Sequence, residues 1–329
     1  MARGARARAG VCYAPRVTAA GVGRHFDLEP LADGVWACVH RAGGWAVGNA
    51  GIVDLGDATL VFDAGLTPEA GEELAAAART LTGRAPTQLL LSHYHNDHLR
   101  GFQAFSGAPL IASEATRALV DTLGRWELTS DLEHGAAQLV ETRALEHAGD
   151  PVRRAAARSF VPYWEALVAT APRIALRLPE VTFEGRLRFH GARRRADFVS
   201  LGAGHTPDDA VLILPDDGVV FCGDLLFVAS HPYLADGDPE GWLRALGVLK
   251  GFGAARYVPG HGPVGTAADL DALSAHIAGL QATADALHRD GVASSDLGDP
   301  RPGDASLAWD FAFPFYRSNV RFLLRRLEG

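Results

Sequence analysis

The hydrophobic positions of this chain recur with two different spacings, which predict strands in some segments and helices in others. Short apolar runs bounded by glycine, proline or polar residues predict strands. The first two such runs are joined by Gly56-Asp57, a dipeptide typical of a hairpin turn. The predicted strands are a hairpin within 51–65 and the runs 88–91, 109–112, 181–183, 187–190, 198–201, 210–214, 219–222 and 256–258.

Apolar residues three or four positions apart predict the helices. The first helix lies between Thr67, a suitable N-cap, and Gly83, a suitable end. Another follows Ser113, and residues 125–178 have mostly helical character. Two later helices each carry one apolar stripe, formed by Trp242, Leu246 and Leu249 in one and by Leu270, Leu273, Ile277, Leu280 and Leu287 in the other.

The order of these elements indicates the fold class. Strands and a helix are followed by a helical stretch, and then by further strands and helices. A layered α/β protein fits this order best. The arginines near the start are not followed by the apolar stretch of a secretory signal. We therefore expect residues 1–24 to form a disordered N-terminal segment.

Composition excludes several classes of function. Hydrophobic residues make up 48% and charged residues 21% of the 329 residues, as in ordinary globular proteins. The net charge of −8 gives no electrostatic reason to expect a nucleic-acid partner. No apolar run approaches the roughly 18 residues needed to cross a bilayer. Three scattered cysteines, Cys12, Cys38 and Cys222, favour a cytoplasmic protein without a disulfide framework.

The strongest sign of chemistry is a polar segment at a strand end, Ser92-His93-Tyr94-His95-Asn96-Asp97-His98. Residues two apart in an extended segment point to the same side, so His93 and His95 are placed to bind one metal ion. The chain must then turn, which lets Asp97 and His98 face a second ion. Imidazole nitrogens and carboxylate oxygens are the ligands expected for Zn²⁺. Core packing alone does not readily explain such a cluster.

Three later residues lie in similar surroundings. His205, Asp224 and His261 each follow a predicted strand in a loop that contains glycine. Such loops let the backbone approach a site closely. Taken singly, each of these residues is explained equally well as a metal ligand or as a structural residue. The argument for metal binding therefore depends on the whole set.

The whole set, His93-x-His95-x-Asp97-His98 with His205, Asp224 and His261, resembles the metallo-β-lactamase-fold hydrolase superfamily over roughly residues 28–290. The resemblance implies a four-layer αββα sandwich with its site at one edge of the two sheets. It also implies the metal ligands: His93, His95 and His205 for one ion, Asp97, His98 and His261 for the other, and Asp224 as the bridge. Asp63 matches the family's early aspartate, which supports the metal ligands from outside.

This likeness predicts one domain over residues 25–329, with a helical insertion at about 125–178 and a helical C-terminal extension at about 305–329. The insertion either forms a lid, with Trp126, Tyr163 and Trp164 as candidate substrate contacts, or is a packed helical pair. His231 and Tyr233 are candidate substrate-pocket residues, because they follow Asp224 closely. The run Arg193-Arg194-Arg195 is expected to be a solvated turn.

Two residues narrow the family comparison. His95 differs from the glutamate of the diiron flavoproteins, and Asp224 differs from the true β-lactamases, which have cysteine or no bridging carboxylate there. Cys222 is expected to be a buried thiol rather than a ligand. A binuclear site bridged by an aspartate is most similar to those of glyoxalase II-like thioesterases, lactonases and related esterases.

The predicted function is therefore hydrolysis of an ester, thioester, lactone or related acyl bond of a small-molecule substrate, by a hydroxide that bridges two metal ions. Asp97 and Asp224 are the predicted catalytic residues. Zinc is the expected metal, and the same ligands also suit Fe²⁺ or Mn²⁺. A sulfur dioxygenase with one iron held by His93, His95 and His205, and a phosphodiesterase, remain as alternatives. The pattern indicates no oligomeric state.

Overall fold

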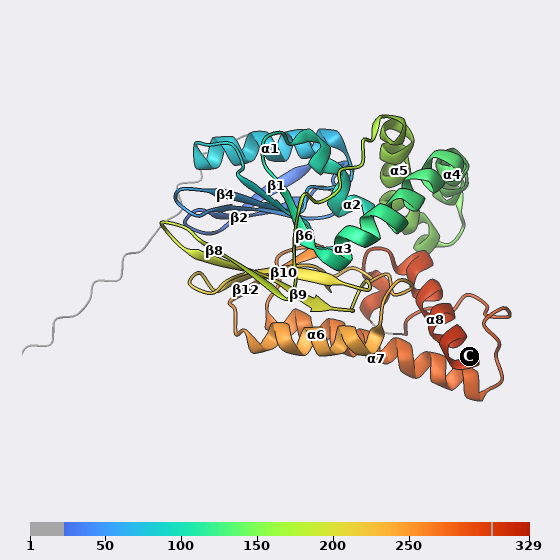
Figure 1. Ribbon diagram of the computed structural model, residues 1–329. Coiled ribbons are helices and arrows are strands. Elements are labelled where there is room, and N and C mark those ends of the chain that lie inside the picture. The colour runs from blue at the N-terminus through green and yellow to red at the C-terminus, as the bar shows by residue number, and fades with distance from the viewer. Residues whose placement is uncertain (1–22, 304) are drawn as a thin grey trace, which may run out of the picture.

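The computed structural model describes residues 23–303 and 305–329, and these fold into four layers. Helix α1 (Pro68–Thr82) covers the outer face of a seven-stranded sheet, as Figure 1 shows. A five-stranded sheet faces the first, and α6 (Pro239–Gly251) and α7 (Ala267–Arg289) cover its outer side. The layers form an αββα sandwich, which confirms the predicted fold class.

The first sheet has the strand order β1 to β7, with β4, β5 and β6 parallel to one another. Its strands are β1 (Phe26–Ala32), β2 (Val35–His40), β3 (Ala50–Asp54), β4 (Thr59–Phe62), β5 (Gln88–Leu90), β6 (Leu110–Ser113) and β7 (Val181–Phe183). The predicted hairpin is present as β3 and β4, which pair antiparallel. Strands β1 and β2 were not among the predicted elements.

The second sheet has the order β12-β11-β10-β9-β8, in which β11 and β12 are parallel. Its strands are β8 (Arg186–His190), β9 (Arg195–Gly202), β10 (Asp209–Leu214), β11 (Val219–Phe227) and β12 (Arg256–His261). Strand β11 runs five residues beyond the predicted end at Cys222, because it continues through an irregularity at Gly223.

The apolar face between the two sheets is closely packed. Phe62 of the first sheet lies 6.3 Å from Phe198 and 5.8 Å from Phe221 of the second, measured between ring centroids. A Cβ atom on Gly51 would approach Phe221 Cδ1 to 2.7 Å, so glycine at this position leaves room for the ring. Cys222 is buried on the other side of β11, as expected for a structural thiol.

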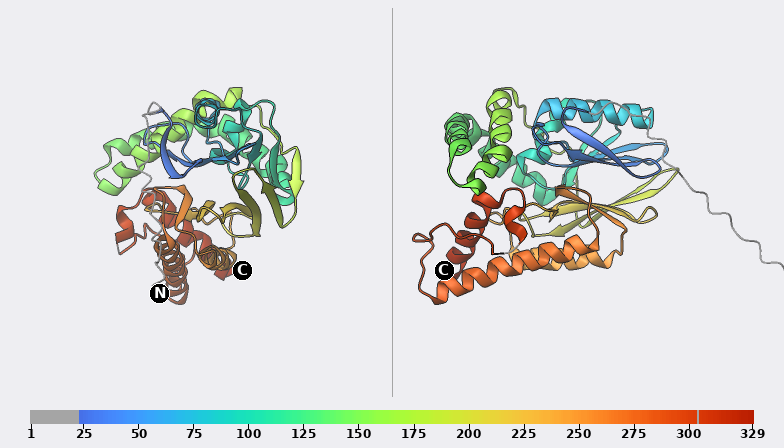
Figure 2. Two further views of the ribbon diagram at one scale, coloured as in Figure 1. Left: turned by 90° about the vertical axis from the view of Figure 1, so that its left-hand side faces the viewer. Right: turned by 180° about the vertical axis from the view of Figure 1, so that it is seen from behind.

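The remaining helices lie largely at one end of the sandwich (Figure 2). They are α2 (Asn96–Leu99), α3 (Glu114–Leu119), α4 (Arg125–Ala144), α5 (Pro151–Thr170) and α8 (Ala312–Glu328). Short 3-10 or π turns occupy Arg100–Ala104, Val120–Gly124, Leu145–His147, Ala171–Arg173 and Ala305–Ala308. The stretch predicted as helical to residue 178 leaves the helical conformation after Arg173.

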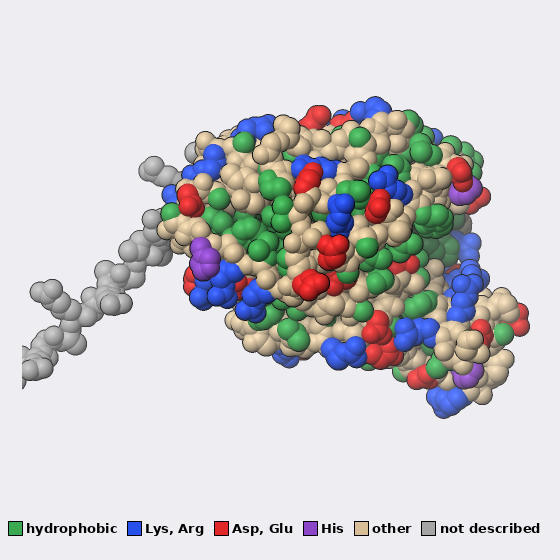
Figure 3. All heavy atoms as spheres, viewed as in Figure 1, with side chains coloured by type: hydrophobic (Ala, Val, Ile, Leu, Met, Phe, Trp, Pro, Cys, Tyr) green, Lys and Arg blue, Asp and Glu red, His purple; other side chains and the backbone are tan. Residues whose placement is uncertain are grey.

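Helices α4 and α5 are inserted between β6 and β7 and pack on each other, while α8 packs on α5 and α7. Of the predicted disordered segment, only Gly23 and Arg24 lie within the described residues. Among those residues no helix combines the length and apolar character needed to span a bilayer. Basic and acidic side chains are interspersed over the face seen in Figure 3.

The arginine run 193–195 is only partly a solvated turn. Arg193 is exposed, but the Arg194 side chain is buried and lies 3.1 Å from Asp217. Arg194 also donates to the backbone carbonyl of Asp33 in the turn between β1 and β2. The prediction was wrong for Arg194, because the fold brings a carboxylate and a carbonyl to it from distant segments.

Candidate metal centre

The two sheets present all of the predicted ligands at one edge. His93 and His95 follow β5, Asp97 and His98 lie in the short helix α2, and His205 lies in the loop between β9 and β10. His261 is the last residue of β12. Asp224 lies within β11 rather than in a loop after it, beside Gly223, which has a φ of 52°.

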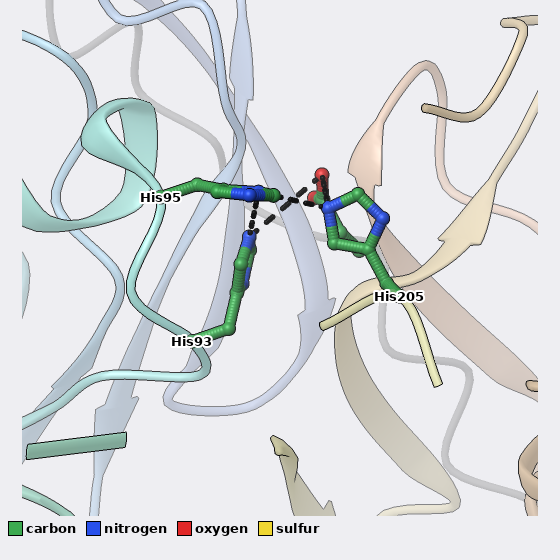
Figure 4. A group of neighbouring side chains, drawn as sticks. His93, His95 and His205 are labelled. Atoms are coloured by element: carbon green, nitrogen blue, oxygen red, sulfur yellow. Dashed lines mark hydrogen bonds and ion pairs between the residues drawn. The ribbon is translucent and has the colours of Figure 1, made fainter. Parts of the chain in front are cut away.

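Three histidines form the first group of ligand atoms. His95 Nδ1 lies 3.1 Å from His93 Nε2 and 2.9 Å from His205 Nε2. Figure 4 shows the three rings turned toward one point, with a carboxylate at its side. That carboxylate is Asp224, whose Oδ2 is 3.3 Å from His205 Nε2 and 3.9 Å from His93 Nε2.

Asp97, His98 and His261 form the second group. Asp97 Oδ2 lies 3.3 Å from His261 Nε2 and 3.8 Å from His98 Nε2. Asp224 also faces this group, with Oδ1 3.0 Å from His98 Nε2 and Oδ2 3.3 Å from His261 Nε2. The structure therefore places Asp224 between the two groups.

Glycines allow the backbone to pass close to these ligands. A Cβ atom on Gly260 would collide with Asp224 Oδ1. A Cβ atom on Gly48 would come within 2.8 Å of His98 Cε1. Larger residues at either position would displace a ligand side chain.

Asp63 orients His98 from behind. One of its carboxylate oxygens accepts hydrogen bonds from His98 Nδ1 at 2.9 Å and from Ser92 Oγ at 2.8 Å, and the other accepts from the Ser92 backbone N–H at 2.8 Å. Since Nδ1 of His98 donates to Asp63, its Nε2 is the atom left for a metal. Asp63 has a φ of 55°, an uncommon conformation for a residue other than glycine that is found at functional sites.

Asp236 has the same relation to His95, and the sequence did not predict it. Its Oδ2 lies 3.0 Å from His95 Nε2 and accepts a hydrogen bond of 2.8 Å from the Tyr94 hydroxyl. His95 is therefore held with Nδ1 toward the other histidines. The only sequence signal was an acidic residue near Asp224 in a glycine-containing loop, which is too common to identify a role.

The electrostatics of the first group suit metal ligation. Burial lowers the pKa of His205 to about 3 and the pKa of His93 well below its usual value, so both rings are neutral at pH 7. Metal-bound imidazoles must be neutral. His98 Nε2 and Asp224 Oδ1 are both buried, and they face each other at 3.0 Å without the geometry of a hydrogen bond.

The second group is rich in negative charge. Burial opposes the charged ring of His261, but Asp224 and Asp97 raise its pKa to about 9. Despite burial, His98 and His261 hold the pKa of Asp97 at about 2. A divalent cation would replace the protons that these carboxylates now attract. The donor set of both groups therefore fits divalent metal ions.

A cavity of about 530 Å³ lies beside the second group. It is lined by the loop after β2, by α5 and by residues 307–313. His40, at the end of β2, lines it and lies 6.1 Å from the His261 ring. Burial, with His261 close by, lowers the pKa of His40 to about 4, and its Nδ1 lies 3.1 Å from Asn49 Oδ1.

The insertion contributes differently through its two helices. Tyr163 of α5 lines the cavity, and its hydroxyl accepts a hydrogen bond of 3.1 Å from Asn96 of the ligand segment. Trp164 packs against Leu66 and its neighbours. Trp126 of α4 is 67% exposed. Of the three candidate contacts, Tyr163 thus lines the cavity, Trp164 packs on the core and Trp126 lies exposed.

The structure does not place His231 or Tyr233 on the wall of this cavity. His231 is buried against His276, Trp309 and Tyr316, with Nε2 2.7 Å from the Ser306 carbonyl oxygen. Tyr233 packs on Phe315, and burial together with nearby carboxylates raises its pKa to about 12. Tyr233 nevertheless lies near Asp236, the partner of His95, so its place in a substrate pocket stays a prediction.

Comparisons with known proteins agree with this geometry. The family model of the metallo-beta-lactamase superfamily matches residues 43–261. A linear primary-alkylsulfatase of Pseudomonas sp. (strain ATCC 19151) is 22% identical over 231 aligned residues, and the match covers 64% of this chain and 40% of that protein. A metallo-beta-lactamase type 2 of Bacteroides fragilis is 39% identical over 70 residues, or 20% of this chain and 28% of that protein. This chain thus spans less than half the length of either relative.

A solved structure shares the fold. The metallo-beta-lactamase from Pontibacter korlensis superposes with a TM-score of 0.56 and 21% sequence identity. The match covers 77% of this chain and 98% of that chain. At this identity the likeness supports the architecture alone.

Proposed function

Since this chain belongs to the metallo-beta-lactamase superfamily, we propose that it is a binuclear metallo-hydrolase that cleaves an ester, thioester, lactone or related acyl bond. The observation that carries the proposal is the position of Asp224, within 3.3 Å of histidine nitrogens from both ligand groups. A carboxylate in that place suits two metal ions close together. Zinc is the first candidate, and iron or manganese would suit the same ligands.

Two bound divalent ions would supply a hydroxide at neutral pH and polarise the bond under attack. Around the two ions, the residues of the chain would have different roles. Asp224 and Asp97 provide the negative charge that keeps two cations together. Asp63 and Asp236 hold the rings of His98 and His95 in their ligating orientation. His40 supplies a neutral ring on the cavity wall, whose Nε2 has no hydrogen-bond partner among the described residues.

Hydrolysis of a sulfate ester is a second candidate. It is favoured by the likeness to a linear primary-alkylsulfatase, which covers 64% of this chain. Attack on the tetrahedral sulfur of a sulfate ester and attack on an acyl carbon both need a nucleophile and a cationic site. The presence of a second complete ligand group, Asp97, His98 and His261, favours either hydrolysis over a dioxygenase with one iron.

Metal analysis combined with a substrate panel tests the proposal. We expect close to two equivalents of metal per chain, and turnover of acyl esters that is lost with a chelator and restored by the metal. The panel should include thioesters, lactones, alkyl sulfates, phosphodiesters, and a persulfide with oxygen consumption as its readout. Turnover of alkyl sulfates alone would select the second candidate.

The matched variants are Asp224→Asn and Asp285→Asn. Asp224→Asn should lower kcat/KM roughly a hundredfold or more, because it removes the charge between the two groups. Asp285 is exposed on α7, so Asp285→Asn should behave as the unchanged protein. Full activity in metal-stripped protein, or in Asp224→Asn, would contradict the proposal.

A further inference from the structure

The cavity beside His261 has a lining that hydrolysis by itself does not require. Its volume of about 530 Å³ lies within the roughly 300–1,000 Å³ of small-molecule sites. Most of its wall is apolar, and includes Val152 and Ala155 of α5 with Leu307, Phe311 and Phe313 of the C-terminal segment. The charged lining residues are Arg41, Arg158 and Asp310.

The apolar wall contacts residues that lie beside the candidate ligands. The ring of Phe311 lies 6.2 Å from the ring of His261. On the opposite segment, Val47 lines the cavity directly before Gly48, the residue that approaches His98. Two sides of the cavity wall therefore lie next to the second ligand group.

The backbone of two wall residues is unusual. Val47 and Phe311 have φ values of 63° and 59°, in the left-handed region that residues other than glycine rarely adopt. Such conformations concentrate where a structure faces a ligand. Both residues lie on the cavity wall, although they come from separate segments. The surrounding structure therefore holds the backbone of this wall in conformations that valine and phenylalanine do not favour.

We propose that this cavity binds an aliphatic chain of the substrate, with the bond to be cleaved at the metal ligands. The inference rests on the proposed function and specifies its substrate class. An acyl chain and the alkyl chain of a sulfate ester have the same apolar chemistry, so the wall suits either. Burial of such a chain between Val152, Ala155 and Leu307 removes apolar surface from water on both partners.

The first experiment measures kcat/KM of the metal-loaded protein for acetyl, hexanoyl and decanoyl esters with the same leaving group. Each buried methylene should raise kcat/KM about fourfold until the cavity is filled. The same series with alkyl sulfates distinguishes the two sources of the chain. Equal kcat/KM values along whichever series is hydrolysed would overturn the inference.

Two variants fill or charge the cavity, and each has a control on the same helix. Ala155→Trp and Val152→Arg should reduce the decanoyl-to-acetyl ratio of kcat/KM at least tenfold. Ala169→Trp and Val168→Arg change exposed positions of α5 and should leave that ratio unchanged. Thermal unfolding of each variant identifies any that fails to fold. If one cavity variant fails, the other is compared with its own control: Ala155→Trp with Ala169→Trp, or Val152→Arg with Val168→Arg.

Decanoate binding to the metal-free protein, measured by calorimetry, is the readout without turnover. Binding that is weakened at least tenfold in Ala155→Trp or Val152→Arg, but not in their controls, supports the inference even if no ester is hydrolysed. In that case the proposed function fails and the cavity assignment holds. If esters are hydrolysed without chain-length preference and all variants bind decanoate equally, the proposed function holds and the cavity assignment fails.

Discussion

Two of the candidate ligand side chains are held by carboxylates that do not belong to either ligand group. Asp63 fixes His98, and Asp236 fixes His95 through the nitrogen that points away from the other histidines. Each interaction determines which ring nitrogen carries the proton. Each carboxylate is itself held by a neighbouring hydroxyl, that of Ser92 at Asp63 and that of Tyr94 at Asp236.

Removal of Asp236 should weaken metal binding without unfolding the protein. Asp236→Ala leaves His95 free to rotate, so the affinity for Zn²⁺ should fall roughly tenfold to hundredfold. Asp236→Asn keeps an acceptor oxygen and should recover part of the loss. Competition with a chromogenic chelator measures the affinity, and Asp285→Ala is the exposed control. Unchanged affinity in Asp236→Ala would exclude a positioning role.

At the scale of elements, the residue that caps helix α1 also contacts a distant loop. Thr67 Oγ1 accepts a hydrogen bond of 3.2 Å from the Ala70 backbone N–H and donates one of 3.2 Å to the Trp45 carbonyl. The first interaction is the predicted N-cap. The second ties the helix to the loop after β2, which carries Val47 to the cavity wall.

Thr67→Ala should therefore lower the free energy of unfolding by about 1 kcal/mol, since the cap and the loop contact are both lost. Thr67→Ser retains the hydroxyl and should cost less than the alanine variant. Urea unfolding at equilibrium measures both changes. If Thr67→Ser and Thr67→Ala unfold at the same urea concentration, the hydroxyl does not contribute as described.

At the scale of the whole molecule, contact between the two sheets holds the ligand groups together. His93, His95, Asp97 and His98 come from the first sheet side, whereas His205, Asp224 and His261 come from the second. Phe221 lies fully buried between the sheets, three residues before Asp224. The packing that stabilises the fold thus also sets the spacing of the ligands.

Phe221→Ala should lower the free energy of unfolding by about 3–5 kcal/mol, because it leaves a cavity between the sheets. Phe221→Leu keeps most of the apolar volume and should cost less. Both variants are compared by urea unfolding and by metal content. A loss of less than about 1 kcal/mol in Phe221→Ala would show that the sheets do not depend on this ring.

The sequence by itself determined the features that depend on neighbours along the chain. The two hydrophobic periods predicted a layered α/β protein, and the family resemblance implied the αββα sandwich. The spacing of His93, His95, Asp97 and His98 indicated metal ligands, because a strand alternates its side chains and the chain then turns. The helix cap at Thr67 and the hairpin turn at Gly56-Asp57 were also predicted, because each depends on residues close together in the sequence.

Only the tertiary structure decided the features formed between distant segments. Asp236 reaches His95 across 141 positions, and Arg194 is buried by Asp33 and Asp217, contacts that no local pattern encodes. The cavity wall combines residues 40–47, α5 and residues 307–313. Burial and ion pairing are properties of the packed chain. The candidate metal ligands could therefore be named from the sequence, whereas the carboxylates that orient them and the cavity beside them could not.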